Sequence, residues 1–278
     1  MRLHIQAHPP QYQSISGLAR SNDSAYLAVH DVKVGQEGAR LSRYDPGTGD
    51  MAAVEVDWSA TGLANDLEGI AQVDGSQESY MAVEGSRWRG RTPQLFTMSY
   101  RDGKVVAEKK HDLPELPHEV EGVAAKKMED GSLLVLLGGR GEDIDDPGRL
   151  HWASYDQESE ELSWSRQGLD GTPITLPYDL GPGQRTLSDI QLTPGGDLWG
   201  SATRDEGDEG PFESLIYKIG SLNGNSSNPV TLNLSEPHYV GGSKVEALTM
   251  HGERENSLFF GCDNETYGGT LNSGLFSV

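Results

Sequence analysis

A short pattern recurs five times along the chain: an apolar residue, then serine or glutamate, then in most copies a small residue and an apolar one. The five serine or glutamate positions are Ser16, Glu68, Glu121, Ser188 and Glu246. Because they hold the same place in successive repeats, we expect their side chains to face one another at one level of the fold. Carboxylate and hydroxyl oxygens suit Ca²⁺, which takes six to eight oxygen ligands at about 2.3–2.6 Å. The pattern therefore predicts a calcium site with one residue from each repeat.

The three motif glutamates are also compatible with sites that hold no calcium. Like charges crowded in a partly desolvated place must take up protons or surround a cation. Zinc would require histidine or cysteine at these positions, and magnesium prefers a tighter octahedral shell. Alternatively, the glutamates pair with arginines or bond to backbone amides as a structural ring, or each begins a solvated strand.

The elements that must position these residues are short strands. The motif positions lie 52, 53, 67 and 58 residues apart, and a second apolar strand and usually two more follow each. Four strands per unit are typical of a propeller blade, and 35 glycines and 14 prolines supply frequent turn signals. We predict an all-β, single-domain, five-bladed β-propeller of four-stranded antiparallel blades; a β-sandwich with accidental repetition is the alternative. The predicted blades are roughly 14–60, 65–113, 118–168, 185–236 and 243–278, the last completed by 1–10.

The two ends of the chain are expected to meet in the last blade. The fifth repeat stops after a third strand at 273–278, whereas a strand-like segment at 2–8 precedes the first repeat. An N-terminal strand that closes the last blade would remove an exposed sheet edge. The long spacing before Ser188 indicates an insertion at 168–185 without a clear strand, which could cover one face.

A ligand site is predicted at the mouth of the channel. The first strand of a blade lines the channel and the second runs antiparallel to it, so the end of the second lies level with the motif. Several residues expected at these strand ends are arginines. Their guanidinium groups, beside a divalent cation, would suit a phosphate, sulfate or carboxylate group, although they could merely neutralise the carboxylates nearby. We therefore expect an anionic small molecule, glycan or peptide as partner. The candidate ligand-binding residues are Asp31, Glu84, Arg87, Arg140, Arg204 and Asp263, and the same strand ends bring Lys33 and Glu265 to the channel mouth.

Catalytic residues are not evident from the sequence. His30 is a weak candidate for a general base, and His118 is a weaker one. The chain has no Ser-His-Asp spacing, glycine-rich phosphate loop or His-Glu-x-x-His run. Whether the protein is an enzyme is left open; an enzyme of this kind would be a metal-dependent hydrolase.

The charge of the chain excludes some partners. Asp and Glu outnumber Lys and Arg by 43 to 22, a formal net charge of -21, which repels nucleic acid and anionic membranes. No apolar run has the length of a membrane span or signal peptide, and Cys262 is the single cysteine. We expect a soluble monomer that binds neither nucleic acid nor membrane. It would be cytoplasmic as given, and secreted or periplasmic if a leader has been removed.

The order Ser-Gly, Glu-Gly, Glu-Gly, Ser and Glu across the five motifs resembles the SdiA-regulated family of bacterial five-bladed propellers. The resemblance implies that the family's calcium site corresponds to the five motif residues, although Asp189 and Ala247 replace the usual glycine. The arrangement is also similar, more distantly, to calcium-activated apyrases and phytase-like esterase propellers. Three functions remain open: calcium-dependent binding of an anionic ligand, calcium-dependent hydrolysis of phosphoanhydride, phosphoester or lactone bonds, and a protein-interaction scaffold.

Overall fold

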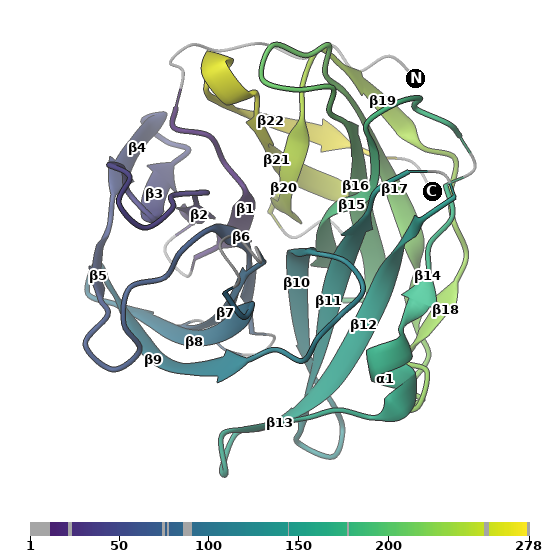
Figure 1. The fold of residues 1–278 in the computed structure, drawn as a ribbon. Coiled ribbons are helices and arrows are strands. Elements are labelled where there is room, and N and C mark those ends of the chain that lie inside the picture. The colour runs from purple at the N-terminus through teal and green to yellow at the C-terminus, as the bar shows by residue number, and fades with distance from the viewer. Residues whose placement is uncertain are drawn as a thin grey trace.

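Five small antiparallel sheets surround a common axis and form a five-bladed β-propeller (Figure 1). The computed structural model describes residues 12–21, 24–73, 76, 78–85, 91–143, 145–176, 178–252 and 256–276. The predicted all-β, five-bladed fold is confirmed. No helix in these ranges is long and apolar enough to cross a membrane.

Within every blade the strands follow chain order from the channel outward. The first blade contains β1 (Gly17–Arg20), β2 (Tyr26–Val29), β3 (Leu41–Asp45) and β4 (Asp50–Ala53). The second contains β6 (Leu67–Gln72), β7 (Ser79–Glu84), β8 (Gln94–Arg101) and β9 (Lys104–Asp112). The third contains β10 (Val120–Lys127), β11 (Leu133–Gly141), β12 (Pro147–Asp156) and β13 (Glu161–Ser163). The fourth contains β15 (Gln184–Leu192), β16 (Asp197–Arg204), β17 (Glu213–Leu222) and β18 (Val230–Leu232), and the fifth contains β20 (Val245–Met250), β21 (Ser257–Asp263) and β22 (Gly269–Leu275).

Three short strands extend the outer parts of the blades. They are β5 (Glu55–Asp57), parallel to β9; β14 (Thr172–Pro173), paired with β12; and β19 (His238–Gly241), paired with β17. The remaining elements are helix α1 (Arg166–Asp170) and the 3₁₀ turn η2 (Glu265–Tyr267). The insertion at 168–185 thus contains the end of α1 and strand β14, so the expectation of no strand there is wrong. The prolines in this segment weaken its strand signal in the sequence, although proline is tolerated in an edge strand.

The start of the described chain lies against the last strand of the fifth blade. Tyr12 and Gly269 exchange backbone hydrogen bonds, N–H to O, of 3.0 and 2.7 Å. This pairing puts Tyr12 at the outer edge of β22, where a fourth strand would lie. The strand predicted at 2–8 falls outside the described residues.

Apolar clusters fill the spaces between neighbouring blades. Leu27 and Phe96 belong to the cluster between the first and second blades, and Phe260 and Phe276 to the cluster between the fourth and fifth. The other three blade interfaces have clusters of the same kind. Burial of apolar surface between blades therefore holds the five sheets in a closed ring.

The inner strands of neighbouring blades approach so closely at the motif that a side chain does not fit. A Cβ atom added to Gly17 would lie 2.8 Å from Cα of Gly69, and one added to Gly69 would lie 3.1 Å from Cα of Gly122. One added to Gly122 would lie 2.6 Å from the backbone nitrogen of Ile190. Glycine after the motif serine or glutamate is therefore a packing requirement in the first three blades.

The fourth blade departs from glycine and uses the extra side chain as a link. Asp189 is buried, and its carboxylate accepts hydrogen bonds from Ile190 N–H at 2.7 Å and from Leu248 N–H at 2.6 Å. Leu248 belongs to β20, so the second bond joins the fourth blade to the fifth. The departure seen in the sequence has a structural reason.

Replacing Gly122 by alanine should destabilise the protein. The new methyl group would meet backbone atoms that cannot rotate away, and such overpacking typically costs about 1–3 kcal/mol. Chemical denaturation would measure the free energy of unfolding. Gly47→Ala is the control, because Gly47 lies in an exposed turn and its nearest neighbour is a side-chain oxygen of Asp45. A Gly122→Ala protein as stable as the parent would contradict the packing requirement.

Candidate functional site at the channel mouth

The three motif glutamates lie at β-bulges at the start of inner strands. The strand pairing shifts register across Glu68, Glu121 and Glu246, between the residue before and the residue after each of them. A bulge leaves one residue out of the ladder and redirects its side chain. The same local irregularity thus directs three carboxylates toward one cavity from three blades.

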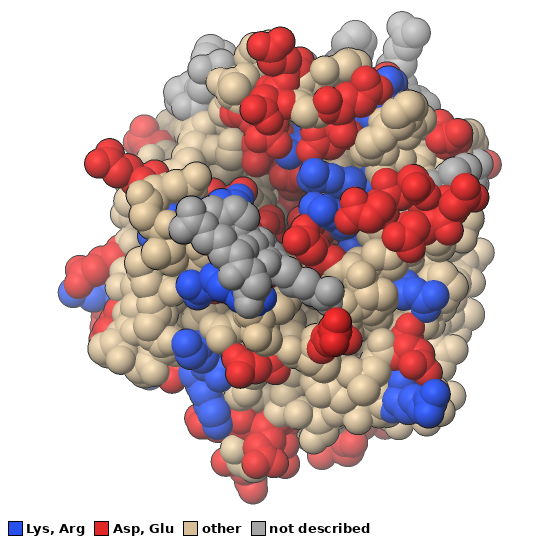
Figure 2. All heavy atoms as spheres, in the orientation of Figure 1, with Lys and Arg blue, Asp and Glu red and all other residues tan. Residues whose placement is uncertain are grey.

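That cavity is about 280 Å³ in volume, and all the described residues that line it are charged. Figure 2, drawn in the orientation of Figure 1, shows acidic and basic side chains side by side around a hollow near the middle of the face toward the viewer. The lining residues are Asp31, Lys33, Asp66, Glu68, Glu119, Glu121, Arg140, Arg185, Lys244, Glu246, Asp263 and Glu265. Eight of these are acidic and four are basic, so the cavity has an excess of carboxylates.

Three carboxylates from the first two blades converge on one side of the cavity. One oxygen from each of Asp31, Asp66 and Glu68 can be chosen so that all lie within 4.8 Å of one another. The Nζ atom of Lys33 is 2.7 Å from Asp31 and 2.9 Å from Asp66. The ammonium group of Lys33 therefore pairs with two of the three carboxylates.

Burial and mutual repulsion perturb the acidity of this group. Desolvation, together with the neighbouring Asp66, raises the pKa of Asp31 to about 7. Desolvation and the charges of Glu121, Asp66 and Asp31 raise the pKa of Glu68 well above its ordinary value. A cation placed among the three would reverse both shifts, because it stabilises the ionised carboxylates.

The other side of the cavity is a network of ion pairs. Arg140 lies 2.8 Å from Glu119 and 3.2 Å from Glu121. Arg185 and Lys244 lie 3.4 and 3.3 Å from Glu246. Two of the three motif glutamates thus have cationic partners, which is the structural alternative that the sequence left open, while Glu68 joins the acidic group.

The two motif serines are buried and bond within their own blades. The Ser16 hydroxyl accepts a hydrogen bond from the backbone N–H of Asp31 at 3.2 Å. The Ser188 hydroxyl lies 2.8 Å from Oγ1 of Thr203. Neither serine lines the cavity, although Ser16 fixes the backbone that carries Asp31.

Of the residues predicted at the mouth, Asp31, Arg140 and Asp263 line the cavity. Glu84 does not: its carboxylate is buried, accepts a hydrogen bond from Asn65 N–H at 2.8 Å and lies 3.3 Å from Arg91.

Arg204, another predicted ligand-binding residue, does not reach the cavity. Arg204 pairs with Glu206 and with Glu213, the latter at 3.3 Å, and is absent from the lining. Arg87 lies outside the described residues.

Neither His30 nor His118, the two candidate general bases, lines the cavity. His30 is buried, and its Nδ1 lies 2.6 Å from the Ser14 carbonyl oxygen. That nitrogen must donate to the carbonyl, so Nε2 accepts from the Ser42 hydroxyl at 2.9 Å. Both ring nitrogens are therefore engaged, and burial lowers the pKa of His30. His118 is also largely buried, and its Nε2 lies 2.9 Å from Asp146.

Four lining residues escaped the sequence reasoning: Asp66, Glu119, Arg185 and Lys244. Three of them stand two positions before a motif glutamate, and side chains two apart in an extended chain point the same way. That spacing could have identified them. Arg185 stands three positions before Ser188 and had no such signal.

Comparison with known proteins supports the fold and does not show a family. No family model matches the chain, and no curated protein matches it. Among solved structures, a thermostable family-43 glycoside hydrolase superposes with a TM-score of 0.58 at 11% identity, covering 98% of this chain and 93% of its own. A glucose dehydrogenase superposes with a TM-score of 0.52 at 10% identity, covering 99% of this chain and 100% of its own. A xylan beta-1,4-xylosidase from Bacillus halodurans superposes with a TM-score of 0.53 at 11% identity, covering 98% of this chain and 54% of its own. At these identities the likeness concerns the fold alone, and the resemblance to SdiA-regulated propellers stays a prediction.

The stability of the protein without divalent cations should fall as pH rises from about 4.5 to about 8. Burial, reinforced by Asp263, raises the pKa of Glu246 to about 8 from a usual value of 4.5. A folded-state pKa above the unfolded one means that the folded form binds the proton more tightly, so this contribution is present at low pH and is lost through that window. Thermal melting at several pH values would measure it.

Glu246→Gln should flatten the pH dependence of the melting temperature, because it removes the titrating group. It should also lower the stability at every pH, because it breaks the ion pairs with Arg185 and Lys244. Glu158→Gln, in an exposed turn, is the matched control and should keep the parent's slope. If the Glu246→Gln protein loses as much melting temperature between pH 5 and pH 8 as the parent does, the pKa assignment is wrong.

Proposed function

We propose that this propeller is a calcium-dependent binding protein for an anionic ligand. In this proposal Ca²⁺ binds among Asp31, Asp66 and Glu68, and the ligand binds beside Arg140, Arg185 and Lys244. The observation that carries the proposal is the convergence of three carboxylates, within 4.8 Å, in a cavity that also holds three cationic side chains on its other side.

The spacing of the acidic group suits calcium. Calcium–oxygen distances are about 2.3–2.6 Å, so two ligands on opposite sides of the ion lie about 5 Å apart, and adjacent ligands lie closer. Oxygens within 4.8 Å of one another can therefore share one ion without large movement of the backbone. Three carboxylates supply three to six ligand oxygens, and water would complete the shell.

Lys33 is the competitor of the ion. Its ammonium group lies between Asp31 and Asp66, at distances typical of ion pairs. Lys33 is partly exposed and has a long flexible side chain, so it can move aside when a divalent cation enters. The alternative is that Lys33 alone neutralises the acidic group and that no metal binds.

Calcium titration would separate these two cases. The parent protein should bind one Ca²⁺ per chain, and Asp66→Asn with Glu68→Gln should abolish binding, because two of three anionic ligands are lost. Lys33→Met should tighten binding, because it removes the competing charge. Isothermal calorimetry measures both effects.

The control for the calcium experiment is Asp112→Asn with Glu115→Gln, two exposed positions away from the cavity. This pair should leave the affinity unchanged. Absence of calcium binding by the parent, or unchanged binding by the Asp66/Glu68 double variant, would refute the proposed site.

The proposal couples the ligand to the ion. With eight acidic and four basic lining residues, the cavity repels anions when all carboxylates are ionised. A bound Ca²⁺ adds two positive charges to the cavity and offsets the negative charge of Asp31, Asp66 and Glu68. Anion affinity should therefore rise with calcium, and calcium affinity with anion, by the same factor.

A hydrolase is the second candidate, and the acidity of Glu246 favours it. Burial raises the pKa of Glu246 to about 8 although Lys244 and Arg185 lie beside it, so its carboxyl group can exchange a proton near neutral pH, as a general acid must. It shares a cavity with the proposed ion, which could polarise a scissile bond and activate water. The phosphoanhydride, phosphoester and lactone substrates named from the sequence remain the classes to test.

Inorganic phosphate is the probe for the anion site. It should bind in the presence of calcium and weaken by about tenfold or more in Arg140→Gln, because a charge-assisted hydrogen bond contributes about 1.5–3 kcal/mol. Arg166→Gln is the control, since Arg166 is 91% exposed on α1. Equal phosphate affinity with and without calcium would refute the coupling, and calcium-dependent turnover of a phosphoester that Glu246→Gln abolishes would establish the hydrolase instead.

A further inference from the structure

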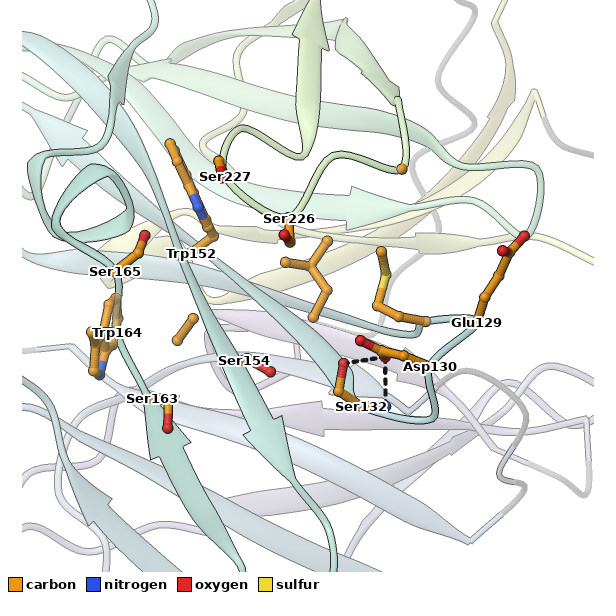
Figure 3. Close-up of a pocket in the computed structure, with 14 residues that line it drawn as sticks. Glu129, Asp130, Ser132, Trp152, Ser154, Ser163, Trp164, Ser165, Ser226 and Ser227 are labelled. Atoms are coloured by element: carbon orange, nitrogen blue, oxygen red, sulfur yellow. Dashed lines mark hydrogen bonds between the residues drawn. The ribbon is translucent and has the colours of Figure 1, made fainter.

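A second and larger cavity lies on the side of the molecule, between the third and fourth blades. It is a groove of about 660 Å³, within the size range of small-molecule sites. Figure 3 shows Ser163, Trp164 and Ser165 at one end of the groove and Glu129, Asp130 and Ser132 at the other. Ser226 and Ser227, from the turn between β17 and β18, lie near Trp152. It shares no residue with the channel mouth.

The groove exists because the two blades diverge as they extend outward. On the face of the third blade, Leu134 pairs across the strands with Ser154, and Ser154 pairs with Ser163. The fourth blade ends in the three-residue strand β18, which leaves this row uncovered. The exposed turn before β18 forms the opposite wall, so an apolar floor meets a rim of hydroxyl groups.

Trp152 carries an unsatisfied hydrogen-bond donor at this groove. The side chain lines the groove, only 5% of the residue is exposed, and Nε1–H has no hydrogen-bond partner within the described ranges. A buried donor left without a partner costs about 1–3 kcal/mol, so native structures rarely keep one without a reason. An acceptor on a bound ligand would satisfy it.

The charge of the lining restricts the ligand. None of the described residues that line the groove is a lysine or arginine, whereas Glu129 and Asp130 lie at one end of it. Anionic ligands would be repelled and would find no counter-charge. The lining offers part of the Trp152 ring, aliphatic side chains and serine hydroxyls that both donate and accept hydrogen bonds, whereas Trp164 packs against the apolar cluster between the second and third blades.

We propose that this groove binds a neutral oligosaccharide. A sugar ring has an apolar C–H face, which would pack on the floor formed by Met128, Leu134 and the accessible part of Trp152, and an edge of hydroxyl groups, which would pair with the serines and with Trp152 Nε1–H. The occupant is a carbohydrate without carboxylate or sulfate groups. Binding is independent of calcium, because the two sites have no residue in common.

The test titrates the full-length protein with linear neutral oligosaccharides of β-linked xylose, glucose and galactose, up to about 10 mM. Quenching of tryptophan fluorescence and calorimetry report binding. At least one neutral sugar should bind saturably, with the same affinity in calcium and in chelator. The uronic-acid oligosaccharide of matching length should bind at least about tenfold more weakly.

Two variants locate the site. Ser154→Glu places a charge in the groove from an exposed strand position and should weaken binding by at least about tenfold. Trp152→Phe keeps an aromatic ring but removes the N–H donor, and should weaken binding while the protein still melts cooperatively. Ser273→Glu is the matched control, because Ser273 is exposed on β22, the third strand of the fifth blade.

Each result decides the proposal. Loss of binding in Ser154→Glu and Trp152→Phe, with Ser273→Glu unchanged, supports it. No neutral sugar bound at the highest concentration, equal binding of the anionic sugar, or binding that persists in both groove variants overturns it.

Discussion

The rest of the structure depends on the close approach of five inner strands around one channel. Neighbouring backbones meet at Gly17, Gly69 and Gly122 at distances that exclude a Cβ atom. The residue just before two of these glycines, Glu68 or Glu121, stands in a β-bulge and carries its carboxylate into the opening. Ring closure and the concentration of charge are thus two results of the same short motif, since the packing that requires glycine also determines where the preceding side chain goes.

Burying so many carboxylates at the channel mouth disfavours their ionised forms, and the two sides of the cavity differ in how this charge is compensated. Arg140, Arg185 and Lys244 neutralise Glu121 and Glu246 by direct contact. On the other side, Lys33 pairs with Asp31 and Asp66, and burial and neighbouring carboxylates disfavour the ionised forms of Asp31 and Glu68. The molecule therefore separates an ion-paired side, where we propose that an external anion binds, from an acidic side, where we propose that a cation binds.

The repeat pattern was sufficient to predict the number of blades, their strand order and the place of the charged cavity, because all three follow from periodicity. It could not predict which motif residues would reach that cavity. Ser16 and Ser188 share the motif position, but their short side chains bond to Asp31 and Thr203 in their own blades. Glu84 and Arg204 were placed at the mouth by strand direction alone, whereas partners such as Asn65 and Glu213 direct them elsewhere. Long-range pairing of this kind has no local signature in sequence.

The backbone pairing of Tyr12 with Gly269 has a consequence for how the molecule comes apart. In an open solenoid the terminal repeats have one neighbour each and can fray independently. Here the segment before the first blade is joined to the last strand of the fifth, so every blade has two neighbours and none is terminal. Detaching any single blade would expose two apolar faces at once, which favours a protein that opens as a whole or not at all.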